Sequence, residues 1–124
     1  MANPNIAAAT SIVGNTSTTS LTTTSATSIA SNAAASGKVY KINSIVVSNV
    51  DGTSAADITI NLYSAAALGG SATAIASTIS VPADSTLIVT DKTTSFYLLE
   101  DKSIGAIASA ANDLIVTASW EEIT

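Results

Sequence analysis

The chain of 124 residues has four lysines against nine acidic residues, no arginine, histidine or cysteine, and a formal net charge of −5. Without cysteine it can form no disulfide and no thiolate metal site, and without histidine it lacks the base of the serine and cysteine triads. A nucleic-acid surface needs clustered Lys and Arg, and an anionic membrane would repel an acidic chain, so we expect neither partner.

Charge is also scarce in absolute terms. Charged residues make up 10% of the chain, against about 25% in a typical soluble domain. The mean hydropathy is +0.45. The length fits one domain with a core of its own. Because a free monomer with so few charges tends to associate, we expect a homo-oligomer or a subunit that is partly covered by other proteins.

Residues 1–36 form a Ser/Thr/Ala-rich segment that we assign to the same domain as the rest. Met1–Asn5 has no positive region, and no apolar run approaches the ~18 residues of a membrane span, so we expect neither a secretory signal nor a span. Threonine prefers strands, so the Thr-rich stretch Leu21–Ile29 favours one or two weak strands. A flexible, low-complexity arm is the alternative.

From Gly37 on, apolar and polar residues alternate with period two, and residues 37–124 are the predicted β-sandwich core. The first strand is predicted over Val39–Val50. Its two faces carry Tyr40, Ile42 and Val46 on one side and Val39, Ile45 and Val47 on the other. Val50–Thr53 contains Asp-Gly, a turn signal, and predicts a hairpin with a strand that carries Ile58, Ile60 and Leu62 on one face.

The middle of the chain predicts one loop and three short strands. Ser64–Ala74 carries Gly69-Gly70 and is predicted to be a loop. A strand follows over Ile75–Val81 and ends at Pro82, which cannot donate a ladder hydrogen bond. Leu87–Thr90 and Ser95–Leu99 are the next two predicted strands.

At the end of the chain Ile104–Ala108 is predicted to pair with Leu114–Ile123. The inward stripe of the last strand is Leu114, Val116, Ala118 and Trp120. With no convincing helix, about eight short strands predict an all-β fold, an antiparallel β-sandwich (jelly-roll-like or Ig-like) with an extended N-terminal segment. The predicted core residues are Ile58, Ile60, Leu62, Ile79, Val116 and Trp120.

No residue pattern in the chain predicts catalysis. The acidic pairs Glu100–Asp101 and Glu121–Glu122 are neighbours in sequence, and neighbours on a strand point to opposite faces, so they do not converge on one substrate. Asp51–Thr53 lacks the repeated acidic spacing of a calcium loop. We therefore predict that the chain is not an enzyme and has no metal site and no cofactor.

The five aromatic residues leave a sugar-binding module open as an alternative. An exposed aromatic platform typifies such modules, and Tyr63, Tyr97 or Trp120 are the candidates. The other interpretation is that Trp120 and Phe96 are core or interface anchors.

Four segments resemble small virion structural proteins of tailed bacteriophages: Met1–Ile6, Ala33–Ile45, Val81–Leu87 and Leu114–Ile123. The likeness covers nearly the whole chain and consists of strand and turn patterns without a catalytic signature. It implies a β-sandwich on the capsid exterior or in the neck or tail. The Ser/Thr-rich segment at residues 15–32 is longer than the family pattern.

Residues and resemblance together predict a capsid decoration (cement) protein, which binds the assembled shell of a virion in the host cytoplasm and stabilises it. Its predicted partners are the major capsid protein or other virion proteins. The N-terminal arm, roughly Ala2–Val13, is predicted to add a strand to a coat subunit. The predicted interface residues are Asn3, Asn5, Ile6, Ile12 and Val13.

Two alternatives remain from sequence. One is a neck, tail or baseplate component of the same particle, and the other is a carbohydrate-binding or adhesion module. Copy number per virion separates the first from a decoration protein, and glycan binding tests the second.

Overall fold

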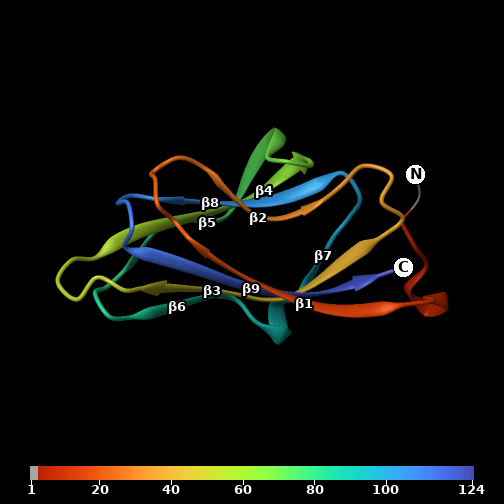
Figure 1. The fold of residues 1–124 in the computed structure, drawn as a ribbon, viewed down its shortest axis with the longest axis horizontal. Helices are drawn as coiled ribbons and strands as arrows, with labels where there is room; N and C mark the ends of the chain where they lie inside the picture. The colour runs from red at the N-terminus through yellow and green to blue at the C-terminus, as the bar shows by residue number, and fades with distance from the viewer. Residues whose placement is uncertain (1–2) are drawn as a thin grey trace.

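The computed structural model describes residues 3–124, which form two packed antiparallel sheets (Figure 1). The strands are β1 (Ile12–Ser20), β2 (Thr27–Asn32), β3 (Val39–Asn49), β4 (Ala56–Ala65), β5 (Gly69–Val81), β6 (Thr86–Thr90), β7 (Phe96–Leu98), β8 (Lys102–Ala108) and β9 (Leu114–Ile123). Two single-turn 3₁₀ helices, η1 (Ile6–Ala8) and η2 (Lys92–Thr94), complete the assigned elements. The predicted all-β antiparallel sandwich is confirmed.

One sheet has the strand order β1-β9-β3-β6, with β7 also paired to β3, and we call it sheet A. The other, sheet B, has the order β2-β8-β4-β5. Successive strands mostly alternate between the two sheets, and this is the strand order of a jelly roll with β7 added. In Figure 1 sheet B is the upper layer and sheet A the lower one.

This alternation contradicts two predicted hairpins. β3 and β4 lie in different sheets, and so do β8 and β9, so neither pair shares a ladder. The reason is that the next strand can bury its apolar face in two ways. It can join the same sheet beside the previous strand, or it can join the other sheet and face the previous strand across the core. Side-chain alternation along the chain is the same in both cases.

The real hairpin joins β4 and β5, where a loop over Ser64–Ala74 was predicted. Only a short turn separates β4 from β5, because Ala67 and Leu68 adopt left-handed backbone angles (φ 55° and 60°) and reverse the chain tightly. Gly70, with φ 72°, continues the reversal at the start of β5. Alanine and leucine rarely adopt left-handed angles, so the sequence gives no sign of this tight turn. The prediction of a long loop over Ser64–Ala74 was wrong for that reason.

Two strands of the Ser/Thr-rich segment belong to the sandwich. β1 pairs with β9 in sheet A, and β2 pairs with β8 in sheet B. The predicted strand over Leu21–Ile29 is wrong in position, since residues 21–26 connect the two sheets. Leu21 itself is fully buried and anchors that connection in the core.

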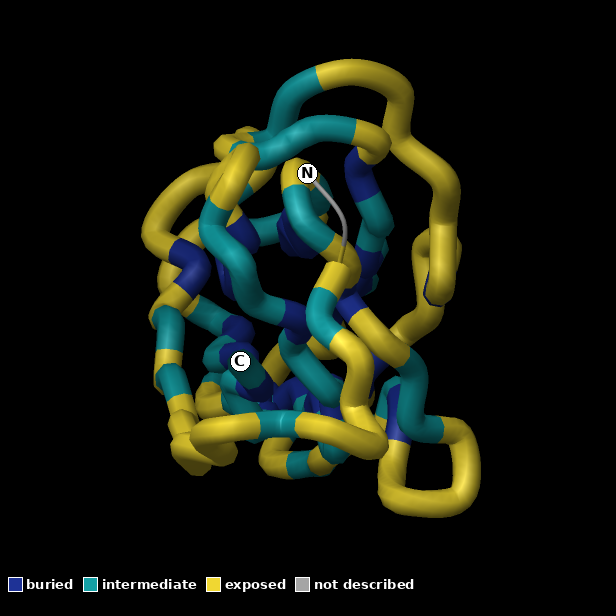
Figure 2. The backbone as a smooth tube through the Cα atoms, turned by 90° about the vertical axis from the view of Figure 1, so that its right-hand side faces the viewer, coloured by how far each residue is buried: buried dark blue, intermediate teal, exposed yellow. Residues whose placement is uncertain are grey.

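The core lies between the sheets, where Figure 2 shows the buried segments enclosed by exposed ones. The predicted inward stripe of β9 is confirmed, because Leu114, Val116, Ala118 and Trp120 are all buried. In β3 the predicted faces are partly wrong. A bulge between Ile42 and Ser44 adds a residue against β9, so Ile42 points into the core together with Ile45 and Val47.

The six predicted core residues divide by position in the sheets. Ile58, Ile60, Val116 and Trp120 are buried, and Leu62 is half-buried against the core. Ile79 corrects the prediction, since its side chain is 40% exposed. It is the register partner of Ile58, but it sits on β5, which is an edge strand of sheet B. At an edge, the cover from the opposite sheet ends.

Candidate assembly surface

The predicted interface residues all lie on the surface at one end of sheet A. Ile6, Ile12 and Val13 are 50%, 61% and 57% exposed, and Asn3 and Asn5 are exposed as well. Ile12 and Val13 are neighbours on β1 and point to opposite faces of sheet A, so Ile6 and Ile12 mark the candidate binding surface and Val13 lies on the other face.

The arm that carries these residues is tied to its own domain. Asn3 Oδ1 accepts a hydrogen bond from the Glu100 backbone N–H (2.9 Å), and Asn5 Oδ1 accepts one from the N–H of Ala7 (3.0 Å) and so begins η1. Ile12 and Val13 already pair with β9. The arm therefore presents an edge that can accept a strand, in contrast to the predicted free strand that would be donated.

A shallow apolar groove of about 320 Å³ lies where the arm crosses sheet A. The arm contributes Asn3, Pro4, Asn5 and Ile6, and the sheet contributes Val39, with Tyr97 and Leu99 from β7 and its end. Tyr97 and Leu99 are 43% and 41% exposed. Together with Ile12, which pairs with Ile123 beside Val39, the groove extends the apolar surface to the edge of the sheet.

The second component of the surface is the open edge of β1. Ser11 and Thr124 exchange backbone hydrogen bonds, and Leu21 N–H donates to Leu114 C=O. Because antiparallel pairs alternate, the odd-numbered residues of β1 direct their N–H and C=O groups to β9. The even-numbered residues direct theirs outward, away from sheet A. They are Ile12, Gly14, Thr16, Thr18 and Ser20.

β1 is the least protected edge in the described part of the chain. It pairs with β9 over nine residues without a register shift, and it contains no proline and no charged residue. The other edges are blunted: β2 has a bulge at Ser28–Ala30, and β5 has register shifts and a left-handed residue, Thr78 (φ 50°). β6 and β7 are short, with five and three residues. Proteins usually guard edge strands with such devices.

A polar network closes the inner side of sheet A at the same end. The Glu122 carboxylate accepts hydrogen bonds from Asn15 Nδ2 (3.1 Å), Lys38 Nζ (3.1 Å) and Trp120 Nε1 (3.3 Å). The Trp120 ring stacks on Tyr40 with a centroid distance of 5.9 Å. Glu122 therefore has a structural role, which holds β1, β9 and the start of β3 together.

The carboxylate of Glu122 is more acidic than usual. Burial alone would raise its pKa, but the three hydrogen bonds and the charge of Lys38 outweigh burial and lower the pKa. The phenol of Tyr40 shows the reverse, since burial and then the negative charge of Glu122 raise its pKa, against a smaller opposing effect of Lys38.

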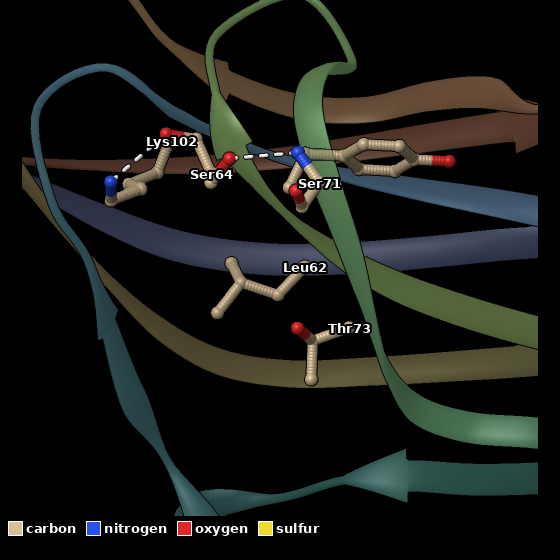
Figure 3. A pocket seen from close by; sticks show the side chains of 6 residues that line it. Leu62, Ser64, Ser71, Thr73 and Lys102 are labelled. Carbon is tan, nitrogen blue, oxygen red and sulfur yellow. Dashed lines mark hydrogen bonds between the residues drawn. The ribbon is translucent and has the colours of Figure 1, made fainter.

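A small pocket of about 200 Å³ opens on the β4–β5 hairpin (Figure 3). Its lining residues are Leu62, Tyr63, Ser64, Ser71, Thr73 and Lys102. Lys102 Nζ donates to the Ser64 carbonyl oxygen (3.0 Å), and Ser64 Oγ accepts from the Ser71 N–H (2.8 Å). The polar groups thus bond to one another across the hairpin and do not converge on the pocket.

The aromatic residues do not form the exposed platform that the sugar-binding alternative requires. Tyr63 and Trp120 are 8% and 6% exposed, so only Tyr97 of the three candidates presents its ring to solvent. Among residues 3–124 no group of three or more acidic side chains could hold a metal ion. No helix in this part of the chain is long and apolar enough to cross a membrane.

The comparisons with known proteins support the fold. No protein-family model matches the chain, and no curated protein matches its sequence. A solved structure of Bacillus endospore appendages, described as a novel family of disulfide-linked pili, contains a similar chain. The likeness has a TM-score of 0.52 and 20% sequence identity, and it covers 100% of this chain and 96% of the other. At this identity the likeness shows a shared fold.

Proposed function

We propose that this chain is a non-enzymatic structural subunit that binds to an assembled protein shell, specifically as a decoration protein on the capsid of a tailed bacteriophage. The observation that carries the proposal is the apolar groove around Ile6, Tyr97 and Leu99, which is continuous with the open β1 edge. Such a surface suits a protein partner. The resemblance of four chain segments to virion proteins supplies the kind of partner.

The mechanism is binding linkage. A protein that binds the assembled lattice, and not its free subunits, stabilises the lattice by its binding free energy. The rigid sandwich needs no chemistry for this role. Its two sheets hold the groove residues in fixed positions, so little conformational entropy is lost on docking.

The test uses shells of the phage that carries this chain, prepared without the protein. Adding the purified chain should restore resistance to heat. Ile6→Asp or Leu99→Asp should weaken shell binding, because each places a charge in the groove. Ile88→Asp is the matched control, since Ile88 is 62% exposed on β6, away from the groove. Equal heat resistance with and without the chain would refute the decoration role.

A second candidate is a subunit of a tail, neck or filament. The fold likeness to a chain from pili favours this candidate, although this chain has no cysteine and could form no disulfide link. The copy number per particle distinguishes decoration from a neck or tail ring, whereas a filament subunit would assemble from the purified chain without shells. Hundreds of copies support decoration, and a small ring of six or twelve copies supports the neck or tail.

A further inference from the structure

We propose that two copies of this chain pair through their β1 strands, antiparallel and about a twofold axis at Thr16, so that two copies of sheet A merge into one continuous sheet. The pairing itself does not depend on the proposed function. Only the further statement that the dimer is the unit that binds the shell rests on it. Its physical basis is the row of outward backbone groups on β1.

Those groups have no hydrogen-bond partner in the described part of the same chain. Within residues 3–124, the N–H groups of Ile12, Gly14, Thr16, Thr18 and Ser20 donate no hydrogen bond to a backbone or side-chain acceptor. Water can satisfy them in a monomer. A second strand satisfies them with ladder hydrogen bonds and also removes apolar surface from water, as in other cases of strand addition.

The parity of the ladder selects one register. Outward residues must face outward residues, and a twofold axis at Thr16 places Ile12 opposite Ser20, Gly14 opposite Thr18 and Thr16 opposite itself. Each such pair exchanges two hydrogen bonds. A centre at Asn15 leaves Ser20 unpaired, and a centre at Ser17 leaves Ile12 unpaired. The axis at Thr16 is therefore the register that satisfies the whole strand.

The side chains of β1 suit pairing with a second copy. A charge near a twofold axis meets an equal charge, and β1 carries none. On the outer face the Thr16 side chains meet, and threonine pairs across strands are favourable. On the inner face Val13, which is 57% exposed, meets Thr19 of the second copy. The nearest acids are one strand back on β9, and Glu122 there is bound to Lys38.

The first experiment compares two proline variants by sedimentation velocity and thermal unfolding. Thr16→Pro removes an outward N–H and places the ring where the second copy would bind, so it should abolish dimers and leave the fold intact. Ser17→Pro removes an N–H that points to β9, so it should lower the melting temperature. A Thr16→Pro variant that folds and still dimerises would overturn the proposal.

The second experiment tests the register and does not depend on proline. Thr16→Lys and Thr16→Asp each place like charges opposite one another at the axis, so each should raise the dimer dissociation constant more than about tenfold. An equimolar mixture of the two should form a heterodimer, because the charges then attract. Failure of the mixture to associate would overturn the twofold register at Thr16.

The outcome separates this inference from the proposed function. A wild-type chain that stays monomeric at several hundred micromolar, yet binds and stabilises phage shells, overturns the dimer and leaves the decoration role standing. If the wild-type chain dimerises, Thr16→Pro abolishes the dimer, and the wild-type chain leaves the heat resistance of the shells unchanged, the dimer is supported and decoration is refuted. Trimers or open filaments that persist in Thr16→Pro overturn the inference, since they would use another edge.

Discussion

Asn49 at the end of β3 donates a hydrogen bond from Nδ2 to the backbone carbonyl of Val81 at the end of β5, over 2.9 Å, and so ties sheet A to sheet B. The same amide nitrogen also donates to Ser54 C=O (2.9 Å), and Oδ1 accepts from the Asp51 N–H (2.9 Å). Asn49 is 3% exposed. A buried asparagine with all these partners specifies how the two sheets meet.

Replacing this amide should be costly. Asn49→Ala leaves the buried Val81 carbonyl group without its partner, and it also removes the bonds to the Ser54 carbonyl and the Asp51 N–H in the more exposed turn, so we expect the free energy of unfolding to fall by about 1–3 kcal/mol. Urea unfolding followed by tryptophan fluorescence measures the change. Asn61→Ala is the control, because the Asn61 side chain makes no hydrogen bond within residues 3–124, and its effect should stay below about 0.5 kcal/mol.

The two register partners Ile58 and Ile79 should respond differently to truncation. Ile58 is fully buried, so Ile58→Ala removes packed methyl groups and should cost about 2–5 kcal/mol of unfolding free energy. Ile79 is 40% exposed on an edge strand, so Ile79→Ala should cost about 1 kcal/mol or less. Equal losses in chemical denaturation would contradict the edge position of Ile79.

Two glycines should respond in opposite directions to an added methyl group. A Cβ at Gly105 would lie 2.8 Å from Leu68 Cδ2 and 2.9 Å from Tyr63 Cε2. Ile104 and Ala106 face the core, so a methyl group at Gly105 would point to the outer face of sheet B, where Gly105→Ala should overpack the contact with Tyr63 and Leu68 and cost about 1–3 kcal/mol. Gly14 in β1 has no atom within 4 Å of such a Cβ, so Gly14→Ala should be neutral or slightly stabilising. Melting temperatures of the two variants provide the comparison.

Glu122 should make stability depend on acid pH. Its pKa in the folded chain lies below the ordinary value of 4.5, so its ionised form stabilises the fold above that value. This contribution is lost as pH falls from about 4.5 through the lowered folded-state pKa. Melting temperatures between pH 7 and pH 2 should therefore drop less in Glu122→Gln than in the wild type.

At neutral pH the same variant should cost only about 0.5–1.5 kcal/mol, because glutamine still accepts from Asn15 and Trp120 and because Lys38 is 41% exposed. Glu121→Gln removes the same charge from the outer face of β9 and controls for net charge. A Glu122→Gln curve that is parallel to the wild type down to pH 2 would contradict the role of this network.

The local alternation of side chains determined a good part of this protein from sequence. It predicted strands in most of the right places, the buried stripe from Leu114 to Trp120, and an all-β sandwich. It also showed that Glu121 and Glu122 cannot act together, because neighbours on a strand face opposite sides. These features depend on residues that are close in the chain, where the backbone geometry of a strand is the only rule needed.

The tertiary structure alone decided which strand lies beside which. β3 and β4 look like a hairpin from sequence, yet they lie in opposite sheets, and the bulge after Ile42 turns that side chain into the core. The exposure of Ile79 and the open edge of β1 likewise depend on where each sheet ends. Alternation fixes the face of a side chain within its own strand. Which sheet a strand joins, and whether it lies at an edge, depends on many contacts between residues far apart in the chain, and no single segment of the sequence contains that information.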